Sequence, residues 1–380
     1  MVGEKITITT VSKQSLIKNI SSLGFLQVSS YIFPLITLPY LVRVLGPEKY
    51  GLYNFIIALL SYFNVFIDYG FNFSATRQIS ILKNDKLKLS EIVSNVYTIK
   101  IFFTIISSII LILLLQFVPR LSEEYYAYLI GFSIVVGNAL FPFWLYQGLE
   151  DTRVFVIINF IFRLIFTVSI FFMVKAESDV NILLGLNGGS SVLIGLVAIF
   201  ALIIKGTIKL KFPRISSIKK QLSEGKDIFI SNLGINLYTS SNTVILGFLT
   251  DNTVVGIFSA ADKIRLAIQS LFTPFSQALF PRFAELFRNS IQEAKLLLQK
   301  VTKYVLAAEV IILILVFMFA ETIVSLLLGT DFSDAVLTLR LLSFLPLIIS
   351  MSNISGIMVM LNIGKDRNFK KIVLTAAVIN

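Results

Sequence analysis

The chain has 380 residues, of which 56% are hydrophobic and only 14% charged, and its formal net charge is +11. Soluble domains average about 25% charged residues, so this composition predicts an integral membrane protein. The chain has no Cys and no His, which excludes disulfides, thiol nucleophiles, Cys/His zinc sites and Ser-His-Asp triads.

Ten apolar stretches are long enough to cross a bilayer, since a helix needs about 20 such residues to span the core. They are 20–43, 51–73, 93–118, 125–147, 153–174, 181–204, 228–249, 253–281, 303–328 and 335–361. An eleventh begins near Ile372 and reaches Asn380, which is too short to span. This segment either folds back or is part of a longer chain, and we favour the longer chain. The predicted fold class is an all-α integral membrane bundle with ten full spans and a truncated eleventh.

The basic residues are distributed unevenly between the connecting loops. With the N-terminus in the cytoplasm, 24 of the 33 Lys and Arg lie on the cytoplasmic side, four on the opposite side and five within spans. This bias predicts a multi-pass protein of the bacterial cytoplasmic membrane with a cytoplasmic N-terminus. Nucleic-acid binding is the alternative, but the charges are spread over separate loops beside spans, so we expect no nucleic acid partner. Residues 1–17 are polar and precede a full span, so they are not a cleavable signal peptide.

A basic segment, 205–227, separates six spans from the rest and points to an internal repeat. When residue n is laid over residue n + 205, YGLYNF at 50–55 falls on VGIFSA at 255–260, with Gly51 on Gly256. The alternative is chance similarity between apolar helices. A repeat after six spans implies two lobes related by a pseudo-two-fold axis along the membrane normal. We therefore expect an N-terminal six-helix lobe (1–204), a basic cytoplasmic linker (205–227) and an apparently incomplete C-terminal lobe (228–380). Two parallel lobes with a cleft between them are typical of an alternating-access transporter.

Polar residues recur on single faces of several spans, where they are costly unless they line a cavity or contact another helix. The expected cavity lining is Asn54, Asn64, Asp68, Asn159, Asn232, Asn236, Asp262 and Gln269. The alternative is that these groups only join neighbouring helices. For Lys100, Arg340 and Glu309, which lie nearer the span ends, anchoring at the membrane interface is at least as good an interpretation.

Deep charges are mostly basic and predict an anionic cargo. Arg163, Arg265 and Lys263 outnumber Asp262, and guanidinium groups suit phosphate. Asp262 and Arg265 are three residues apart and could pair with each other, which would leave Arg163 as a free cation. We find no Walker A motif, so transport would draw on ions, the membrane potential or product removal. The sequence indicates no catalytic residue, metal site or cofactor.

Several segments resemble one transporter family. They are SLGFLQVSSYIFPLITLPYLVRVLGPEKYGLYNF (22–55), DYGFNFSATRQIS (68–80), FPFWLYQGLED (141–151), VGIFSAADKI (255–264), ALFPRFAEL (278–286) and LLLGTDFSDAVLTLRLL (326–342). They are similar to bacterial Wzx-type polysaccharide and O-antigen flippases of the multidrug/oligosaccharidyl-lipid/polysaccharide (MOP) superfamily, which have a MATE-like two-lobe fold.

The resemblance implies a cargo, a polyprenyl-pyrophosphate-linked oligosaccharide moved from the inner to the outer leaflet. Arg163, Arg265 and Lys263 would then neutralise the pyrophosphate, and the polar stripes would bind sugar hydroxyls. Glycan polymerase and ligase proteins are potential partners, and we expect a monomer in the bilayer. Three alternatives stay open: a MATE-like drug or metabolite exporter, a peptidoglycan-precursor flippase, and a non-transporting scaffold of the glycan assembly machinery.

Overall fold

The computed structural model describes residues 13–209, 211–360, 362–365, 367–368, 371–372 and 375, and within these ranges it contains helices and no strand. Seven segments are long and apolar enough to cross a membrane. The first of them, Ile32–Leu82, covers the expected span 51–73 and part of the expected span 20–43. None of the seven covers the expected spans 228–249 and 253–281, so the count of ten stays a prediction. The expected eleventh span lies, apart from Ile372 and Thr375, outside the described residues.

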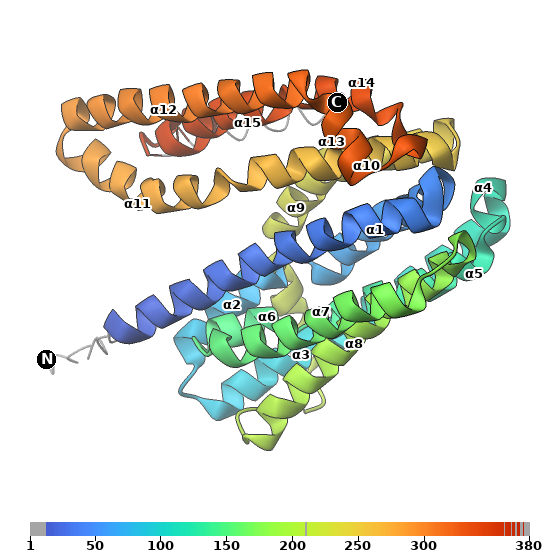
Figure 1. Cartoon of the computed structure of the whole chain (residues 1–380). Coiled ribbons are helices and arrows are strands. Elements are labelled where there is room, and N and C mark those ends of the chain that lie inside the picture. Colours follow the sequence, from blue (N-terminus) through green and yellow to red (C-terminus); the bar gives the residue numbers. More distant parts are fainter. Residues whose placement is uncertain are drawn as a thin grey trace, which may run out of the picture.

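The first helix, α1 (Lys13–Asp68), consists of two arms that run in opposite directions (Figure 1). The chain reverses at Gly46, whose φ of 66° and ψ of 173° interrupt the helix. A positive φ favours glycine, and Pro47 behind it has no N–H to continue the helical ladder. We call these arms the first and second arms of α1.

The remaining helices follow in chain order. They are α2 (Phe71–Leu82), α3 (Lys86–Phe117), α4 (Pro119–Ser122), α5 (Tyr125–Leu140), α6 (Phe143–Gly148), α7 (Thr152–Met173), η1 (Glu177–Asp179), α8 (Val180–Ile204), α9 (Ile215–Leu249), α10 (Asn252–Ser270), α11 (Thr273–Asn289), α12 (Ile291–Met318), α13 (Ala320–Leu327), η2 (Thr330–Phe332), α14 (Ala335–Leu342), α15 (Leu345–Asn353) and the π-helix η3 (Ile354–Met360).

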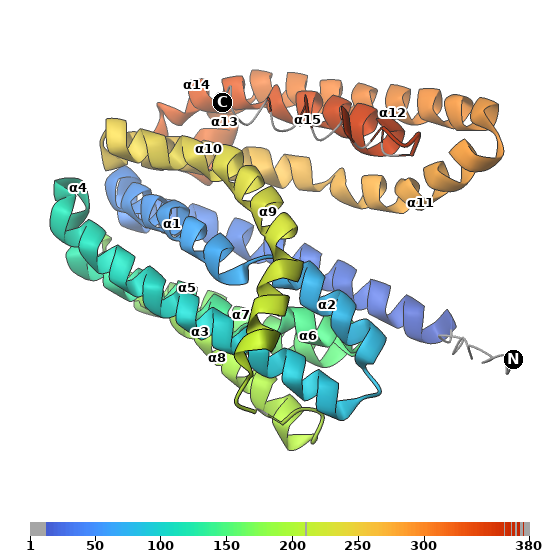
Figure 2. The same cartoon turned by 180° about the vertical axis from the view of Figure 1, so that it is seen from behind.

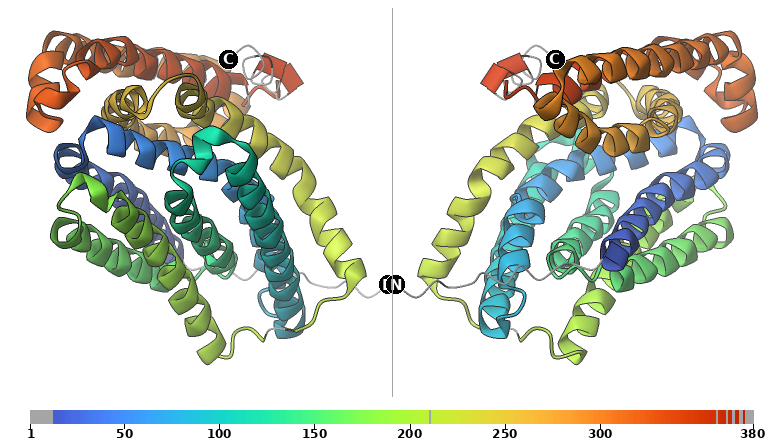
Figure 3. Two further views of the ribbon diagram at one scale, coloured as in Figure 1. Left: turned by 90° about the vertical axis from the view of Figure 1, so that its right-hand side faces the viewer. Right: turned by 90° about the vertical axis from the view of Figure 1, so that its left-hand side faces the viewer.

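The helices form two layers with α1 between them. Figures 1 and 2 show α10–α15 on one side of α1 and the bundle α3–α8 on the other, while α9 crosses from that bundle to α10. The end views in Figure 3 show the same crossing of α9. Apolar side chains of α1, including Leu38 and Leu45, pack in one core with Ile170 of α7 and Ala260 of α10. This shared core joins the two layers through the first arm of α1.

The two ends of the bundle differ in charge and in contacts. One end carries the loops 83–85 and 149–151 and the segments 205–209 and 211–214, and the ion pairs Lys83–Glu150 (2.9 Å) and Lys205–Asp151 (3.2 Å) join three of these segments. We call this the basic end. The opposite end carries the turn at Gly46 and the segments 118–124 and 250–251.

At the opposite end the two layers meet backbone to backbone. A Cβ atom built on Gly51 would lie 1.7 Å from the carbonyl oxygen of Asn252, and one built on Gly256 would lie 2.0 Å from that of Pro47. Only a residue without a side chain fits at either position, as in other close helix contacts within membranes.

Candidate functional site

A polar cavity of about 390 Å³ lies among the second arm of α1, α3, α5 and α9. Its lining comprises Ser61, Asn64, Val65, Asp68, Asn72, Lys100, Asn138, Phe141, Asn232, Ile235, Asn236 and Thr239. The cavity lies toward the basic end, because α1 ends at Asp68 and α5 at Leu140. Four of the residues expected to line a cavity do so: Asn64, Asp68, Asn232 and Asn236.

The charged groups of the lining form a pair. Lys100 Nζ of α3 lies 3.7 Å from Asp68 Oδ1, and the side chains are 3% and 22% exposed. The interpretation of Lys100 as an interfacial anchor was therefore wrong. The position of Lys100 within its predicted span could not show that Asp68 lies against this lysine. Since the two charges offset each other, the lining is close to neutral.

Amide groups supply most of the remaining polarity. Asn64 Oδ1 is buried and has no hydrogen-bond partner among the described residues. Asn236 Oδ1 accepts from Ser61 Oγ at 3.4 Å, which joins α9 to the second arm of α1. Side-chain amides and hydroxyls both donate and accept hydrogen bonds, which is the chemistry that binds sugar hydroxyls.

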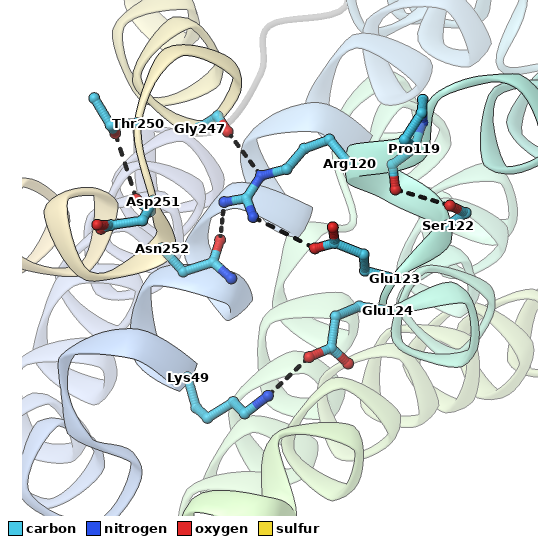
Figure 4. Close-up of polar contacts among 10 residues, drawn as sticks. All are labelled: Lys49, Pro119, Arg120, Ser122, Glu123, Glu124, Gly247, Thr250, Asp251 and Asn252. Atoms are coloured by element: carbon cyan, nitrogen blue, oxygen red, sulfur yellow. Dashed lines mark hydrogen bonds and ion pairs between the residues drawn. The ribbon is translucent and has the colours of Figure 1, made fainter.

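At the opposite end of the bundle, an arginine joins the two layers. Arg120 Nε donates to the carbonyl oxygen of Gly247 at 3.1 Å, and its Nη2 donates to Asn252 Oδ1 at 2.8 Å (Figure 4). Arg120 Nη1 also lies 3.7 Å from Glu123 Oε2. Arg120 thus holds α4 against the end of α9 and the start of α10. We call this set of contacts the Arg120 clasp.

The three predicted phosphate-binding cations lie outside the cavity lining. Arg163 Nη1 on α7 donates to Ser30 Oγ of α1 at 3.0 Å. Arg265 Nε bonds Asp262 Oδ1 and its Nη1 bonds Gln269 Oε1, both at 2.5 Å, so these three predicted residues satisfy one another along α10. The pairing that the three-residue spacing allowed is therefore present.

Lys263 is partly buried on α10 and makes no hydrogen bond or ion pair with any described residue. Arg163, Arg265 and Lys263 therefore do not form one site with the Asn-rich lining. A helical stripe shows which residues share a face, but not which neighbour that face contacts.

The other predicted lining residues are placed by local contacts. Asn54 Nδ2 donates to the carbonyl oxygen of Tyr50, one turn earlier in α1, at 2.7 Å. Asn159 is 1% exposed, and its side-chain amide has no partner within the described part of the chain. Glu309 of α12 is 3% exposed and accepts from Ser350 of α15, so its side chain faces α15 inside the protein.

Residues 16–287 match the model of a family described as "Polysaccharide biosynthesis protein". The chain belongs to this family. It is 33% identical over 370 residues to a protein of Escherichia coli (strain K12) named "Putative O-antigen transporter", and the match covers 97% of this chain and 89% of that protein. A protein of Shigella dysenteriae with the same name is 28% identical over 363 residues, covering 96% of this chain and 90% of its own length. No solved structure matches this chain. Family membership and the apolar helices identify a multi-pass membrane protein of polysaccharide biosynthesis, and the family resemblance expected from the sequence is confirmed.

Proposed function

We propose that this protein is a flippase that moves a polyprenyl-pyrophosphate-linked oligosaccharide from the inner to the outer leaflet of the bacterial cytoplasmic membrane. The relatives named as O-antigen transporters support a cargo of this class. One structural observation carries the proposal. A hydrogen-bonding cavity lies toward one end of a membrane bundle whose two layers are joined at the other end by the Gly51–Gly256 contact and the Arg120 clasp.

This arrangement suits one state of an alternating-access cycle. The basic end faces the cytoplasm in the orientation that the positive charges favour. A cargo would then enter the Asn-rich cavity from the cytoplasmic side while the opposite end is closed. Rocking of the 1–204 lobe against the 228–380 lobe, with 205–227 as the linker, would break the clasp and release the cargo outward. The family membership and the contact between the two layers also support our proposal of a MATE-like arrangement with ten or more spans.

The parts of the cargo would bind different groups. Sugar hydroxyls suit the neutral cavity, where Asn64 Oδ1 lacks a partner and Asp68 and Lys100 offset each other. The pyrophosphate would be neutralised by Arg163 and Lys263, which lie outside the lining of the Asn-rich cavity in this state, and by Arg265 if it leaves Asp262. The prenyl tail would stay in lipid. An anion moved outward across a negative-inside potential gains about 2.3 kcal/mol per charge per 100 mV, so no ATP is required.

Complementation of bacterial strains that lack their own O-unit flippase tests this function. We expect surface polysaccharide to return in at least one strain of a panel with different O-units, and Arg163→Ala to abolish the rescue. Arg153→Ala is the matched control, because Arg153 is exposed at the start of the same helix and is expected to be silent. Absence of rescue in every strain despite normal membrane expression would contradict the proposal and favour an exporter or a scaffold.

A further inference from the structure

A second cavity, at the basic end and separate from the Asn-rich cavity, has a different composition. It has a volume of about 350 Å³ and lies between the first turns of α3 and the segment that links α8 to α9. Its lining comprises Leu87, Lys88, Glu91, Ser94, Lys211, Phe212, Pro213 and Arg214. We call it the linker pocket.

The linker that forms this pocket is fixed to α3. The backbone N–H of Lys209 donates to Ser90 Oγ at 3.0 Å, and that of Lys211 donates to Ser94 Oγ at 2.8 Å. Ile208 is 1% exposed and packs in the core beneath. These contacts hold the backbone of the linker against α3.

The charge of the linker pocket is positive. Lys211 and Arg214 are exposed and make no ion pair with any residue that the structure describes, while Lys88 Nζ lies 3.6 Å from Asp85 Oδ2. The carboxylate Glu91 accepts from Ser217 Oγ at 2.7 Å. Two free cations and a third, weakly paired one therefore face a single hydrogen-bonded acid, which suits an anion.

Large apolar side chains surround the cations without being covered. Phe212 is fully exposed, Ile215 is 75% exposed and Leu87 is 70% exposed. Further along α3, Ile101 and Phe102 are also exposed, as expected of a surface in contact with lipid tails. Aromatic and aliphatic side chains beside Lys and Arg are typical of protein segments at the membrane interface, where the apolar part enters the lipid and the charges meet the headgroups.

We propose that the linker pocket binds the phosphate headgroup of an anionic phospholipid of the cytoplasmic leaflet, with Lys211 and Arg214 on the phosphate and Phe212 among the acyl chains. Two observations carry this assignment: the unpaired cations in a cavity of headgroup size, and the uncovered apolar side chains at its rim. Binding here would fix the linker to the membrane surface. The assignment does not depend on the transported cargo.

Native mass spectrometry of the purified full chain tests this site, with phosphatidylglycerol and phosphatidylcholine as probes. Lys211→Ser combined with Arg214→Ser should weaken phosphatidylglycerol binding by about fivefold per cation, since a basic residue near an anionic surface contributes about that factor. Phe212→Ser should weaken the binding of both lipids. The melting temperature without added lipid checks that each variant is folded.

Lys219→Ser combined with Lys220→Ser is the matched control. It removes the same charge from exposed residues of α9 that do not line the linker pocket. The control should bind phosphatidylglycerol as the unmodified chain does. Equal weakening by both double variants would show general charge attraction and overturn the proposal, as would the absence of any preference for phosphatidylglycerol over phosphatidylcholine. A competition experiment would add RNA to the complex with phosphatidylglycerol. Displacement of the lipid by RNA would also overturn the proposal.

Discussion

Gly51 and Gly256 contact each other reciprocally. A Cβ on Gly51 would meet the carbonyl oxygen of Asn252, and a Cβ on Gly256 would meet that of Pro47. The glycines are 205 residues apart, and so are Pro47 and Asn252, so the two contacts exchange under the proposed repeat. This is the behaviour of residues on either side of a local two-fold axis. The contact supports the proposed lobes, which would then meet at the end opposite the basic loops.

The glycine contact predicts a large effect from one added methyl group. Gly51→Ala would force the layers apart, because the new Cβ would lie 1.7 Å from a backbone oxygen that cannot rotate away. Overpacking of this kind costs about 1–3 kcal/mol. We expect Gly51→Ala and Gly256→Ala each to lower the melting temperature in detergent and to reduce transport.

Gly189→Ala is the control for the glycine contact. A Cβ on Gly189 of α8 would meet nothing within 4 Å. We expect the melting temperature of this variant to equal or exceed that of the unmodified chain, since alanine favours helix more than glycine does. A melting temperature for Gly51→Ala no lower than that of Gly189→Ala would show that the layers are not in tight contact there.

The Arg120 clasp predicts an accessibility change that can be measured with thiol labels. The chain has no Cys, so a single Thr253→Cys change gives a clean probe in the segment beside Arg120. Arg120→Ala removes the bonds to Gly247 and Asn252, and we expect a membrane-impermeant maleimide to label Thr253→Cys several-fold faster. Arg120→Lys should behave similarly, since an ammonium cannot reproduce the guanidinium geometry.

Lys175→Ala is the matched variant for the clasp. It removes an exposed basic residue at the same end of the bundle. Its labelling rate should equal that of the unmodified background. Equal rates in Arg120→Ala and Lys175→Ala would mean that Arg120 does not hold this end closed.

The Asp68–Lys100 pair predicts a stability loss that a second change reverses. Asp68→Asn leaves the buried Lys100 without a counter-charge, and the loss should reach up to about 3 kcal/mol, the low end for a broken buried pair because Asp68 is partly exposed. Adding Lys100→Met should restore stability but not transport, if the charges contact cargo. Asp151→Asn, which breaks the exposed pair with Lys205, should cost no more than about 1 kcal/mol. A thermal unfolding series in detergent separates these outcomes, and equal losses for both single variants would contradict the burial of Lys100.

The capping residue at the start of α3, Asp85, is expected to make a pH-dependent contribution to the stability of the fold. Asp85 Oδ1 accepts from the backbone N–H groups of Lys88 and Leu87, both at 3.1 Å, and these bonds, Lys88 first, lower the pKa of Asp85. The stabilisation is therefore present above the ordinary carboxyl pKa of about 4 and is lost as the pH falls through the lowered value. Asp85→Ala should lower the melting temperature at pH 7, and the difference from the unmodified chain should shrink toward pH 3. A difference independent of pH would contradict this capping role.

Sequence reasoning located one side of the cavity and missed the other. The polar periodicity of the second and seventh predicted spans placed Asn64, Asp68, Asn232 and Asn236 on helix faces that do line the cavity. Lys100 was misassigned, because its burial depends on neighbouring helices rather than on its place in α3. The three-residue spacing did indicate the bond between Arg265 and Asp262, but not the second bond from Arg265 to Gln269. The proposed repeat was found from the alignment of Gly51 with Gly256, and the structure shows why both positions require a residue without a Cβ atom.

Translocation in proteoliposomes tests the central claim most directly. The full chain would be reconstituted with a fluorescent polyprenyl-pyrophosphate-linked oligosaccharide, and a glycosidase outside the vesicles would report cargo that has crossed. The account predicts cleavage of cargo from the inner leaflet well above that in protein-free vesicles, and its loss with Arg163→Ala but not with Arg153→Ala. Cleavage no faster than in protein-free vesicles, from protein that is folded and inserted, would contradict the proposal that this chain is a flippase.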